Sequence, residues 1–368
     1  MNKQCVSFMQ HAIELAERGE GLVEPNPMVG CVLVRDHVVI GQGWHRKFGG
    51  DHAEVSALKD AGEANGATAY VTLEPCCHQG KTGPCTEALV DAGVTKVVVG
   101  CQDPNPAVAG QGLARLRAAG IEVHENVCHE QSLELIRPFR KRMETSTPWV
   151  IAKWAMTLDG KIATSSGSSK WISNSLSRDI VHRIRGRMDS IVVGIGTVLA
   201  DDPLLTARPT GVRTALRIVV DSSCRIPLDS QLVNTAKEFP LLVATSDDAD
   251  SGQIDRLKEQ HCEVLVCPGD NHGDRIQFLL KELTAREHTN ILVEGGSGLF
   301  GTLNDEQLID EVHCFIAPKI VGGKQGLSPF SGIGVVDMNR SRSLANPKIE
   351  VVENDIYVSG RFNKKSDA

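Results

Sequence analysis

The sequence predicts an α/β protein of two domains, and three observations lead to this prediction. Short apolar, β-branched runs alternate with helical patterns, and such alternation is typical of sheets covered by helices. The length of 368 residues exceeds that of one typical domain. Near the middle, Ser146-Thr147-Pro148 ends a helical pattern, because the residue before a proline disfavours the helical conformation. We therefore expect one domain at residues 1–147 and another at 148–368.

The first domain is expected to hold a mixed sheet with helices on both faces. Apolar residues between Val6 and Ala16 recur at helical spacing, and Gly19 and Gly21 end that helix. The predicted strands span residues 29–34, 38–40, 69–73, 97–99 and 121–123, and further helices are predicted at 54–61, 86–92, 112–119 and 128–145.

The second domain opens with an apolar strand at residues 149–154. A helix is expected at residues 177–187, and its arginines are by default solvated surface side chains. Further strands are predicted at residues 191–194, 217–220, 241–244, 264–266 and 291–293, with helical patterns between several of them.

Charge and composition narrow the class of protein. A formal net charge of −7 and an aromatic content of 4% argue against a phosphate-tracking surface or a base-stacking platform, so no nucleic acid is expected as a partner. Eleven cysteines lack the dense spacing of a secreted disulfide framework. With no apolar signal core and no bilayer-spanning segment, we expect a cytoplasmic protein that does not bind membranes.

The most informative motif is His52-Ala53-Glu54 followed by the segment at residues 75–85, PCCHQGKTGPC. It offers one imidazole and at least two thiolates, and three protein ligands on zinc leave a fourth position for water. A bound zinc ion would lower the pKa of that water toward ~7, and Glu54 stands where a general base could take its proton. His-x-Glu followed by a proline-preceded cysteine pair is typical of zinc nucleobase deaminases.

Two points in this motif stay open. Eight residues separate Cys76 from Cys85, where the usual signature has two, and adjacent Cys76 and Cys77 would point to opposite faces of an extended backbone. A closed structural zinc site is the alternative interpretation. Residues i and i+2 do not share a helix face, so His52 and Glu54 meet at one ion only if His52 lies at the helix end.

A glycine-rich loop follows the last predicted strand. Gly296, Gly298 and Gly301 fit G-x-G-x-x-G, a pattern whose backbone N–H groups bind phosphate, although a plain turn is the alternative. About twenty residues on stands Cys314, not the acid that a Rossmann fold places on the ribose 2′-hydroxyl. The loop thus suggests a phosphate site outside the Rossmann fold and permits a 2′-phosphorylated cofactor. A second polar turn, Asp201-Asp202-Pro203, is either a site or a helix cap.

Together these motifs resemble the bifunctional deaminase/reductases of riboflavin biosynthesis over nearly the whole chain. The long gap between Cys76 and Cys85 is the form that this family uses, whereas Cys77 departs from the serine often seen there. The first half resembles the cytidine-deaminase-like domain of the family at residues 25–30, 52–54, 75–85 and 103–106. The second half resembles its dihydrofolate-reductase-like α/β domain at residues 153–163, 170–172, 194–203, 293–301 and 317–319.

The resemblance implies two successive reactions. The first domain would hydrolyse an amine of 2,5-diamino-6-(5-phosphoribosylamino)pyrimidin-4-one with one Zn2+ per chain, and the second would reduce the ribosyl group to ribityl with NADPH. Zinc would be bound by His52, Cys76 and Cys85, while Glu54 would transfer protons.

The resemblance also implies binding residues. Lys153 is added to them because it lies in the strand that opens the second half and is expected near the transferred hydride. Deaminase substrate contacts fall on Asn26, His45, His78 and Lys81. Cofactor contacts fall on Ala155, Trp171, Thr197, Asp201, Ser222, Gly296, Ser297, Gly298, Leu299, Phe300, Gly301 and Thr302. Reductase substrate contacts fall on Ser169, Arg185, Leu205, Arg208 and Glu294.

Two rival hypotheses remain at this point. One is a nucleobase or tRNA deaminase whose second half only binds or acts as a scaffold. The other is a zinc-stapled binding module without catalysis, which the open fourth ligand position and Glu54 argue against. A small-molecule pyrimidine ribosyl phosphate and a homo-oligomer are the expected partners.

Overall fold

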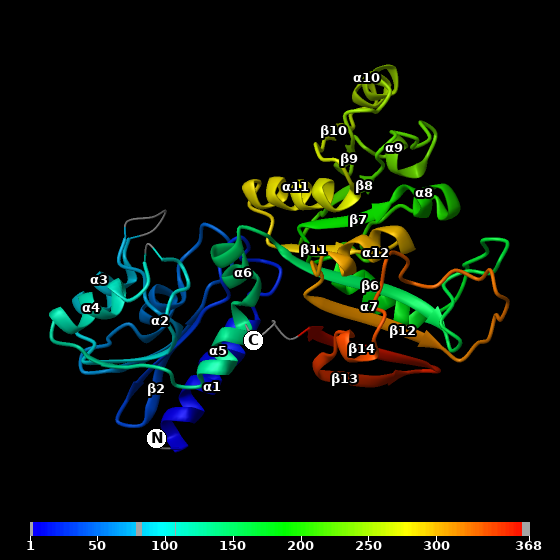
Figure 1. The fold of residues 1–368 in the computed structure, drawn as a ribbon. Helices are drawn as coiled ribbons and strands as arrows, with labels where there is room; N and C mark the ends of the chain where they lie inside the picture. Colours follow the sequence, from blue (N-terminus) through cyan, green and yellow to red (C-terminus); the bar gives the residue numbers. More distant parts are fainter. Residues whose placement is uncertain (1–2, 79–82, 107, 363–368) are drawn as a thin grey trace. The chain divides into compact units, whose positions relative to one another are not determined.

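The computed structural model describes residues 3–78, 83–106 and 108–362 (Figure 1). The chain divides into two compact units, Met1–Ser146 (unit 1) and Thr147–Ala368 (unit 2). No described helix is both long and apolar enough to cross a membrane.

The described part of unit 1 contains a five-stranded sheet in the order β2-β1-β3-β4-β5. β1 pairs antiparallel with β2 and β3, whereas β3, β4 and β5 run parallel, so the predicted mixed sheet is confirmed. The strands are β1 (Gly30–Arg35), β2 (Val38–Trp44), β3 (Thr68–Leu73), β4 (Lys96–Cys101) and β5 (Glu122–His124).

Helices cover both faces of this sheet. One face packs Cys31 and Val71 against α2, α3 and α4, and the other packs Val32 and Val98 against α1 and α5. Neighbouring strand residues serve opposite faces, because side chains alternate along a strand. The helices are α1 (Lys3–Glu17), α2 (Ala53–Ala61), α3 (Cys85–Asp91), α4 (Gln111–Ala118), α5 (His129–Leu135) and α6 (Arg137–Thr145).

Strand β2 is longer than predicted, since it continues through Gly41 and Gly43 to Trp44. Glycine ordinarily weakens a strand and marks a close backbone approach. Here the approach is that of α2: a Cβ atom on Gly43 would lie 2.4 Å from the Ala57 nitrogen, and one on Gly41 would lie 2.5 Å from the Ala57 oxygen. The two glycines therefore let α2 lie directly on the strand, and His52 is the N-cap residue just before this helix.

The prediction of one helix over residues 128–145 is wrong, because the structure has two helices that meet at Ile136. Pro138 stands in the first turn of α6. Proline lacks the N–H that would bond to the preceding turn, and its ring clashes with the carbonyl four residues earlier. A continuous helix through this position would lose stability, so the chain starts a new one.

Unit 2 holds a nine-stranded sheet within its described residues, in the order β10-β9-β8-β7-β11-β6-β12-β14-β13. Strands from β10 to β12 pair in parallel, and β14 pairs antiparallel with both β12 and β13. The strands are β6 (Trp149–Thr157), β7 (Ser190–Gly194), β8 (Leu216–Val220), β9 (Leu241–Thr245), β10 (Glu263–Val266), β11 (Asn290–Val293), β12 (Glu311–Ala317), β13 (Leu344–Val352) and β14 (Asp355–Phe362).

Helices also cover both faces of this sheet. α7 to α10 pack on the face that buries Ile151 and Val193, and α11 and α12 pack on the face that buries Val150 and Val192. The two-domain α/β class is thereby confirmed. The helices are α7 (Ser175–Arg185), α8 (Ile195–Asp201), α9 (Gln231–Asn234), α10 (Ser251–Glu259), α11 (His272–Ala285) and α12 (Ser297–Asp305), with a short 3₁₀ turn at Met338–Arg340.

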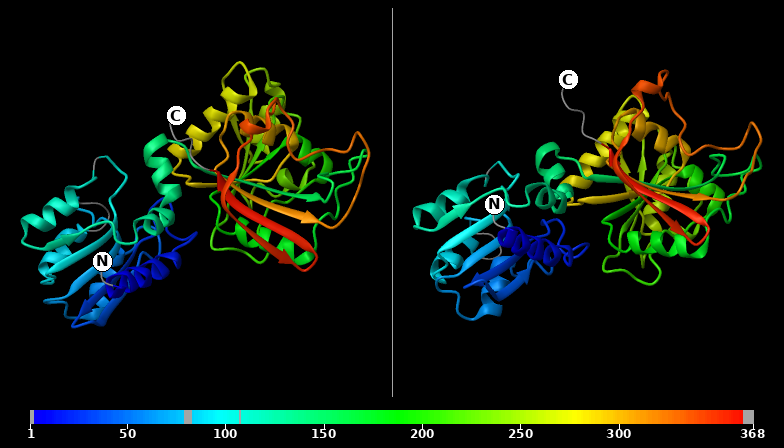
Figure 2. Two further views of the ribbon diagram at one scale, coloured as in Figure 1. Left: turned by 60° about the horizontal axis from the view of Figure 1, so that its bottom comes forward. Right: turned by 90° about the horizontal axis from the view of Figure 1, so that it is seen from below.

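The sequence did not predict β12, β13 or β14. The strands β13 and β14 form an antiparallel hairpin at one border of the sheet, drawn in red in Figure 2. β13 carries Asn346, Pro347 and Lys348, residues that are depleted in strands, and proline is tolerated there because the strand lies at an edge. Local propensity therefore gives no strand signal at this position.

Candidate metal centre and cofactor cavity

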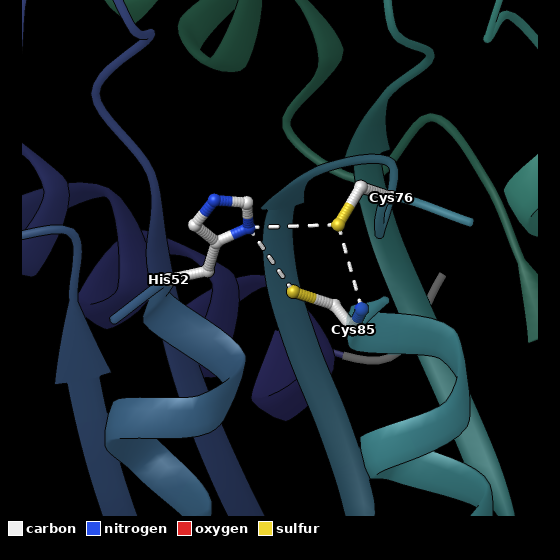
Figure 3. A group of neighbouring side chains, drawn as sticks. All are labelled: His52, Cys76 and Cys85. Atoms are coloured by element: carbon white, nitrogen blue, oxygen red, sulfur yellow. Dashed lines mark hydrogen bonds between the residues drawn. The ribbon is translucent and has the colours of Figure 1, made fainter. Parts of the chain in front are cut away.

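Three predicted metal ligands meet in unit 1. His52 precedes α2 in an extended conformation, Cys76 follows β3, and Cys85 is the first residue of α3. The three side chains point toward one another (Figure 3), and one ligand atom from each lies within 4.8 Å of the others. The His52 Nδ1 atom is 3.2 Å from the Cys85 Sγ atom and 3.5 Å from the Cys76 Sγ atom. His52 thus occupies the helix end that a shared ion requires.

The donor set fits zinc. Sulfur and imidazole ligands suit Zn2+, whereas Mg2+ and Ca2+ prefer oxygen. The pKa of Cys76 is lowered to about 4, because the Cys85 thiol hydrogen-bonds to its sulfur and His52 adds a further hydrogen bond. The Cys85 backbone N–H also donates to the Cys76 sulfur, at 3.4 Å. One thiolate is therefore already favoured before any metal binds.

Cys77 lies outside this group. Among the residues that the structure describes, the metal-binding set contains His52, Cys76 and Cys85 and not Cys77. Burial raises the pKa of the Cys77 thiol, which disfavours the thiolate form that a metal needs. The geometry gives no support to a closed four-ligand site.

Glu54 is buried beside the candidate metal ligands. Burial raises its pKa to about 7, although the neighbouring His52 opposes this shift. Its carboxyl group hydrogen-bonds with the Cys85 thiol. A carboxyl group that titrates near neutral pH can both accept and return a proton.

Two predicted deaminase substrate contacts border this centre. The Asn26 Nδ2 atom lies 3.1 Å from the His45 Nε2 atom, and the His45 ring stands 5.5 Å from the His52 ring, edge to face. Burial lowers the pKa of His45, so the neutral imidazole is favoured. His78 is exposed, and Lys81 falls outside the described residues.

Glu74 is a residue of this region that sequence reasoning missed. Its buried carboxylate accepts hydrogen bonds from the backbone N–H groups of Asp103 at 3.2 Å, Gly110 at 3.0 Å and Gly112 at 2.9 Å. Glu74 thereby ties the loop after β4 to the end of β3, two residues before Cys76. The sequence feature that could have indicated its role is the position of a carboxylate between an apolar strand and the Pro75-Cys76 pair.

In unit 2, a cavity of about 670 Å³ lies at the carboxyl ends of β7, β8, β9 and β11. Such strand ends are the usual ligand sites of open α/β sheets. Gly296 precedes α12 and lines this cavity, so the glycine loop lies where a ligand can bind. The predicted residues that line the cavity are Ser169, Thr197, Asp201, Ser222, Gly296, Ser297, Gly298, Leu299 and Thr302.

Other predicted cofactor contacts do not line this cavity. Phe300 is buried and packs against Trp154 and Phe330. A Cβ atom on Gly301 would lie 2.3 Å from the Ser331 oxygen, so this glycine permits close packing. Trp171 is exposed beneath the Arg178 guanidinium, and Ala155 lies on β6.

The two aspartates at the C-terminal end of α8 divide the two interpretations between them. The Asp201 Oδ1 atom faces the cavity wall and accepts from the Ser169 hydroxyl at 2.7 Å. Asp202 ends α8 and accepts from the backbone N–H of Gln231, the first residue of α9, at 2.8 Å. Asp202 therefore fits the helix-cap alternative, while Asp201 remains available as a site residue.

A buried charged group joins β6, α7 and β11. Arg185 contacts Glu294 through two hydrogen bonds, at 2.5 and 2.9 Å, and the Lys153 Nζ atom lies 3.6 Å from the same carboxylate. The default expectation of a solvated Arg185 is wrong, because its side chain is only 13% exposed. Leu205 is buried and Arg208 is exposed, and neither joins this group.

Two cations determine the charge state of Glu294. Burial alone would raise the pKa of this carboxyl group, but Arg185 and Lys153 outweigh it and hold the pKa at about 2. Burial lowers the pKa of Lys153, and Glu294 opposes that shift. The group is therefore an ionised carboxylate that holds two buried cations.

Comparisons with known proteins match the parts of the chain that contain the two candidate sites. Residues 2–101 match the model of the cytidine and deoxycytidylate deaminase zinc-binding region, and residues 148–358 match that of the RibD C-terminal domain. The riboflavin biosynthesis protein RibD of Actinobacillus pleuropneumoniae is 44% identical over 354 residues, covering 96% of this chain and 94% of that protein. The chain belongs to the RibD family.

Further RibD proteins are similar over the same span. RibD of Aquifex aeolicus is 40% identical over 355 residues, which cover 96% of this chain and 97% of that protein. The structure of Acinetobacter baumannii RibD, form 1, matches with a TM-score of 0.87 and 37% identity, covering 98% of this chain and 99% of that one. The Thermotoga maritima structure of a diaminohydroxyphosphoribosylaminopyrimidine deaminase/5-amino-6-(5-phosphoribosylamino)uracil reductase matches with a TM-score of 0.86 and 36% identity.

RibD membership confirms the resemblance seen in the sequence. The chain is an enzyme with a zinc-binding deaminase domain and a reductase domain. The hypotheses of a single-activity deaminase and of a non-catalytic zinc module are set aside.

We predict that Cys77→Ser retains one zinc per chain, whereas Cys85→Ser loses it. Of these two cysteines, Cys85 lies with His52 and Cys76 in the candidate metal centre and Cys77 does not. Metal content by atomic emission on the purified variants measures this. Zinc loss in Cys77→Ser would show that the ligand set is wrong.

We predict that Glu294→Gln lowers the free energy of unfolding at pH 7 by about 3 kcal/mol, since it leaves Arg185 and Lys153 buried without their carboxylate. The folded pKa of about 2 lies below the ordinary value of ~4.3, so this stabilisation is complete above ~4.3 and is lost as pH falls toward 2. Urea unfolding at pH 7 and pH 3 should show a smaller difference at pH 3. Glu259→Gln removes an exposed carboxylate and is the control, which should unfold as wild type does at both pH values. If the stability difference between Glu294→Gln and wild type were as large at pH 3 as at pH 7, the argument would be contradicted.

Proposed function

We propose that the chain deaminates 2,5-diamino-6-(5-phosphoribosylamino)pyrimidin-4-one and then reduces the ribosyl group of the product to ribityl. The observation that carries the first step is the meeting of His52, Cys76 and Cys85 beside the buried Glu54. A zinc ion held by the three ligands would supply a Lewis acid and an acidified water. The names of RibD relatives support the substrate class.

The side chains around the metal centre have separate roles in this proposal. Glu54, whose pKa is about 7, takes a proton from the attacking water and returns it to the departing amine, so that ammonia leaves as the ring carbonyl forms. His45 and Asn26 orient the pyrimidine from the neighbouring wall. Glu74 is a positioning residue, because it fixes the loop that follows β4 against the strand leading to Cys76.

The second step is proposed for the cavity and the buried charged group of unit 2. NADPH bound along the glycine loop would supply the hydride. Opening of the sugar ring requires a proton at the ring oxygen, and Lys153 is suited to donate it because burial lowers its pKa. Glu294 holds Lys153 and Arg185 in place, and Arg185 with Arg208 would bind the ribosyl phosphate.

We assign the two reactions to residues 1–147 and 148–368, with zinc in the first and NADPH in the second. Each compact unit has its own hydrophobic core and its own candidate site: the metal centre in unit 1, and the cavity with the buried charged group in unit 2. A cytoplasmic location fits the eleven cysteines, all of which are free.

We predict that Glu54→Gln separates the two activities. Ammonia release should fall by about 10⁴-fold or more, because one carboxyl group serves several proton transfers. NADPH oxidation on supplied deaminated substrate should stay near the wild-type rate. Asp201→Asn is the reciprocal variant, which should lower reduction and spare deamination. Loss of both activities in a folded, zinc-loaded Glu54→Gln protein would contradict two separate sites.

We also propose that the chain is a homo-oligomer. Its β13–β14 hairpin would contact the same hairpin of a second copy. Ile349 and Val351 on β13 are more than two thirds exposed, and Val351 shares a sheet face with Ile356 opposite it. Among the residues that the structure describes, β13 is the outer strand of the sheet, and an outer strand with an apolar face can meet its own copy about a two-fold axis.

Charges on this face should dissociate the oligomer. We predict that Ile349→Lys combined with Val351→Lys converts the wild-type species to monomer in sedimentation experiments. Val212→Lys, which charges an exposed valine elsewhere in unit 2, should leave the oligomer intact. A monomeric wild-type protein would contradict this assembly.

A further inference from the structure

The connection between α8 and β8 holds a bulky residue in a strained backbone conformation. Leu205 has a φ of 56°, in the left-handed region that a leucine rarely adopts, and its side chain is buried. Such a conformation persists only where the surrounding structure holds it, and conformations of this kind are concentrated at functional sites. The contacts of residues 204–206 (the Leu205 segment) therefore bear on its role.

A buried arginine holds the segment on the N-terminal side of Leu205. Arg217 lies on β8 and is 1% exposed, and its Nη1 atom donates to the Leu204 oxygen at 3.2 Å. Its Nη2 atom donates to the Leu232 oxygen on α9 at 3.1 Å. Arg217 thus fixes the first carbonyl group of the segment to the core of unit 2.

Two side chains of α7 hold the segment on the C-terminal side. The Thr206 oxygen accepts from the Arg185 Nη1 atom at 3.1 Å and lies 3.2 Å from the His182 Nδ1 atom. Because a carbonyl oxygen can only accept, the proton of the His182 ring stands on Nδ1 and the imidazole is the second donor. The other two nitrogen atoms of Arg185 bind Glu294, so the segment is joined to the buried charged group.

The charges around His182 place Arg208 near the same cluster. Burial lowers the pKa of His182, and Arg185 and Arg208 lower it further, which outweighs the opposite effects of Thr206 and Glu294. A neutral ring is therefore favoured. It can hold the Thr206 carbonyl without adding a third positive charge beside two guanidinium groups.

The two guanidinium groups near His182 suit a phosphate monoester, which arginine binds through paired, charge-assisted hydrogen bonds. Arg185 is held by Glu294, whereas Arg208 is exposed and follows the Leu205 segment directly. The direction of the Arg208 side chain thus depends on how firmly the segment is held. The ribosyl phosphate of the substrate and a phosphate of the cofactor are the two sources of such a group.

We infer that His182 is a positioning residue of the reductase. By donating to the Thr206 carbonyl it holds the Leu205 segment in its strained conformation, and the segment in turn holds Arg208 toward the phosphate of the substrate. The substrate phosphate is favoured over that of the cofactor because Arg185 joins the segment to Lys153 and Glu294, where the reacting sugar is proposed to lie. The inference rests on the proposed reduction of a ribosyl phosphate in unit 2.

The test is steady-state kinetics of the full-length protein with the deaminated substrate and with the same compound lacking its phosphate. His182→Ala should raise the KM for the phosphorylated substrate by about threefold to tenfold, the effect of one lost hydrogen bond, with a smaller change in kcat. The KM for NADPH, the kcat/KM for the dephosphorylated compound and the rate of ammonia release should stay near their wild-type values.

Two further substitutions test the position of the donor. His182→Asn places an amide N–H close to the position of Nδ1 and should restore most of the wild-type KM. His182→Gln places its amide nearer to the position of Nε2, away from the Thr206 oxygen, and should behave as His182→Ala does. Arg183→Gln removes an exposed arginine from the next position on α7 and is the matched control, which should behave as wild type does.

Different failures overturn different claims. A wild type that does not reduce the phosphorylated compound overturns both the proposed function and the inference. If wild type reduces it and His182→Ala keeps the same KM, the inference alone fails. It also fails if His182→Gln restores the KM as well as His182→Asn does, or if the phosphorylated and dephosphorylated compounds lose equally. A raised KM for NADPH with an unchanged KM for the substrate would assign the segment to a cofactor phosphate and overturn the inference.

Thermal unfolding of each variant separates a loss of binding from damage to the fold. If His182→Ala does not fold, the comparison of His182→Asn with His182→Gln still decides the inference, because both side chains keep an amide and differ in where it lies. Equal KM values in these two variants would then overturn the proposed role of His182.

Discussion

Parallel strand pairing determines where the chemistry of both units lies. A parallel pair needs a crossover connection, and the helix of that crossover begins where the preceding strand has ended. In unit 1 the chain leaves β3, supplies Cys76, and enters α3 with Cys85. In unit 2 it leaves β11, supplies Glu294 and the glycine loop, and enters α12 after Gly296. This kind of connection thus brings functional side chains to the carboxyl ends of strands in each sheet, while His52 comes from the connection between β2 and α2.

Two buried glutamates show how environment sets the role of one side-chain type. Burial raises the pKa of Glu54 more than the neighbouring His52 lowers it, so the pKa is about 7 and the carboxyl group can exchange a proton at neutral pH. Glu294 is equally buried, but two cations hold its pKa at about 2 and keep it ionised. The first carboxyl group is suited to proton transfer, and the second is suited to holding Arg185 and Lys153 as a fixed charged group.

The parts of the site predicted from sequence are those encoded locally. His52, Glu54, Cys76 and Cys85 stand in short motifs whose spacing carries their chemistry, and the condition that His52 lie at a helix end follows from helical geometry alone. Contacts between segments that are far apart in the sequence have no comparable short motif. Arg185 belongs to a helix whose other arginines suggest a solvated face, and its partner Glu294 stands 109 residues away.

The same limit applies to the fold. Strands with continuous apolar runs, such as β4 and β9, were predicted because buried parallel strands have that composition. β13 was missed because an edge strand tolerates proline and polar residues, and the extension of β2 was missed because its glycines serve contact with α2. Glu74 was overlooked for a related reason, since its partners are backbone N–H groups with no residue-type signature.

The contact of α2 with the bare backbone of β2 has a consequence for metal uptake. Because Gly41 and Gly43 bring the helix against the strand without intervening side chains, the helix cannot slide or tilt independently of the sheet. The imidazole of His52, the N-cap residue of this helix, is therefore held as firmly as the strands. The ligand atoms already lie within 4.8 Å of one another, so binding of an ion has to order few further side chains or backbone segments. Little of the binding free energy is therefore used to order the protein, which favours tight binding of the metal.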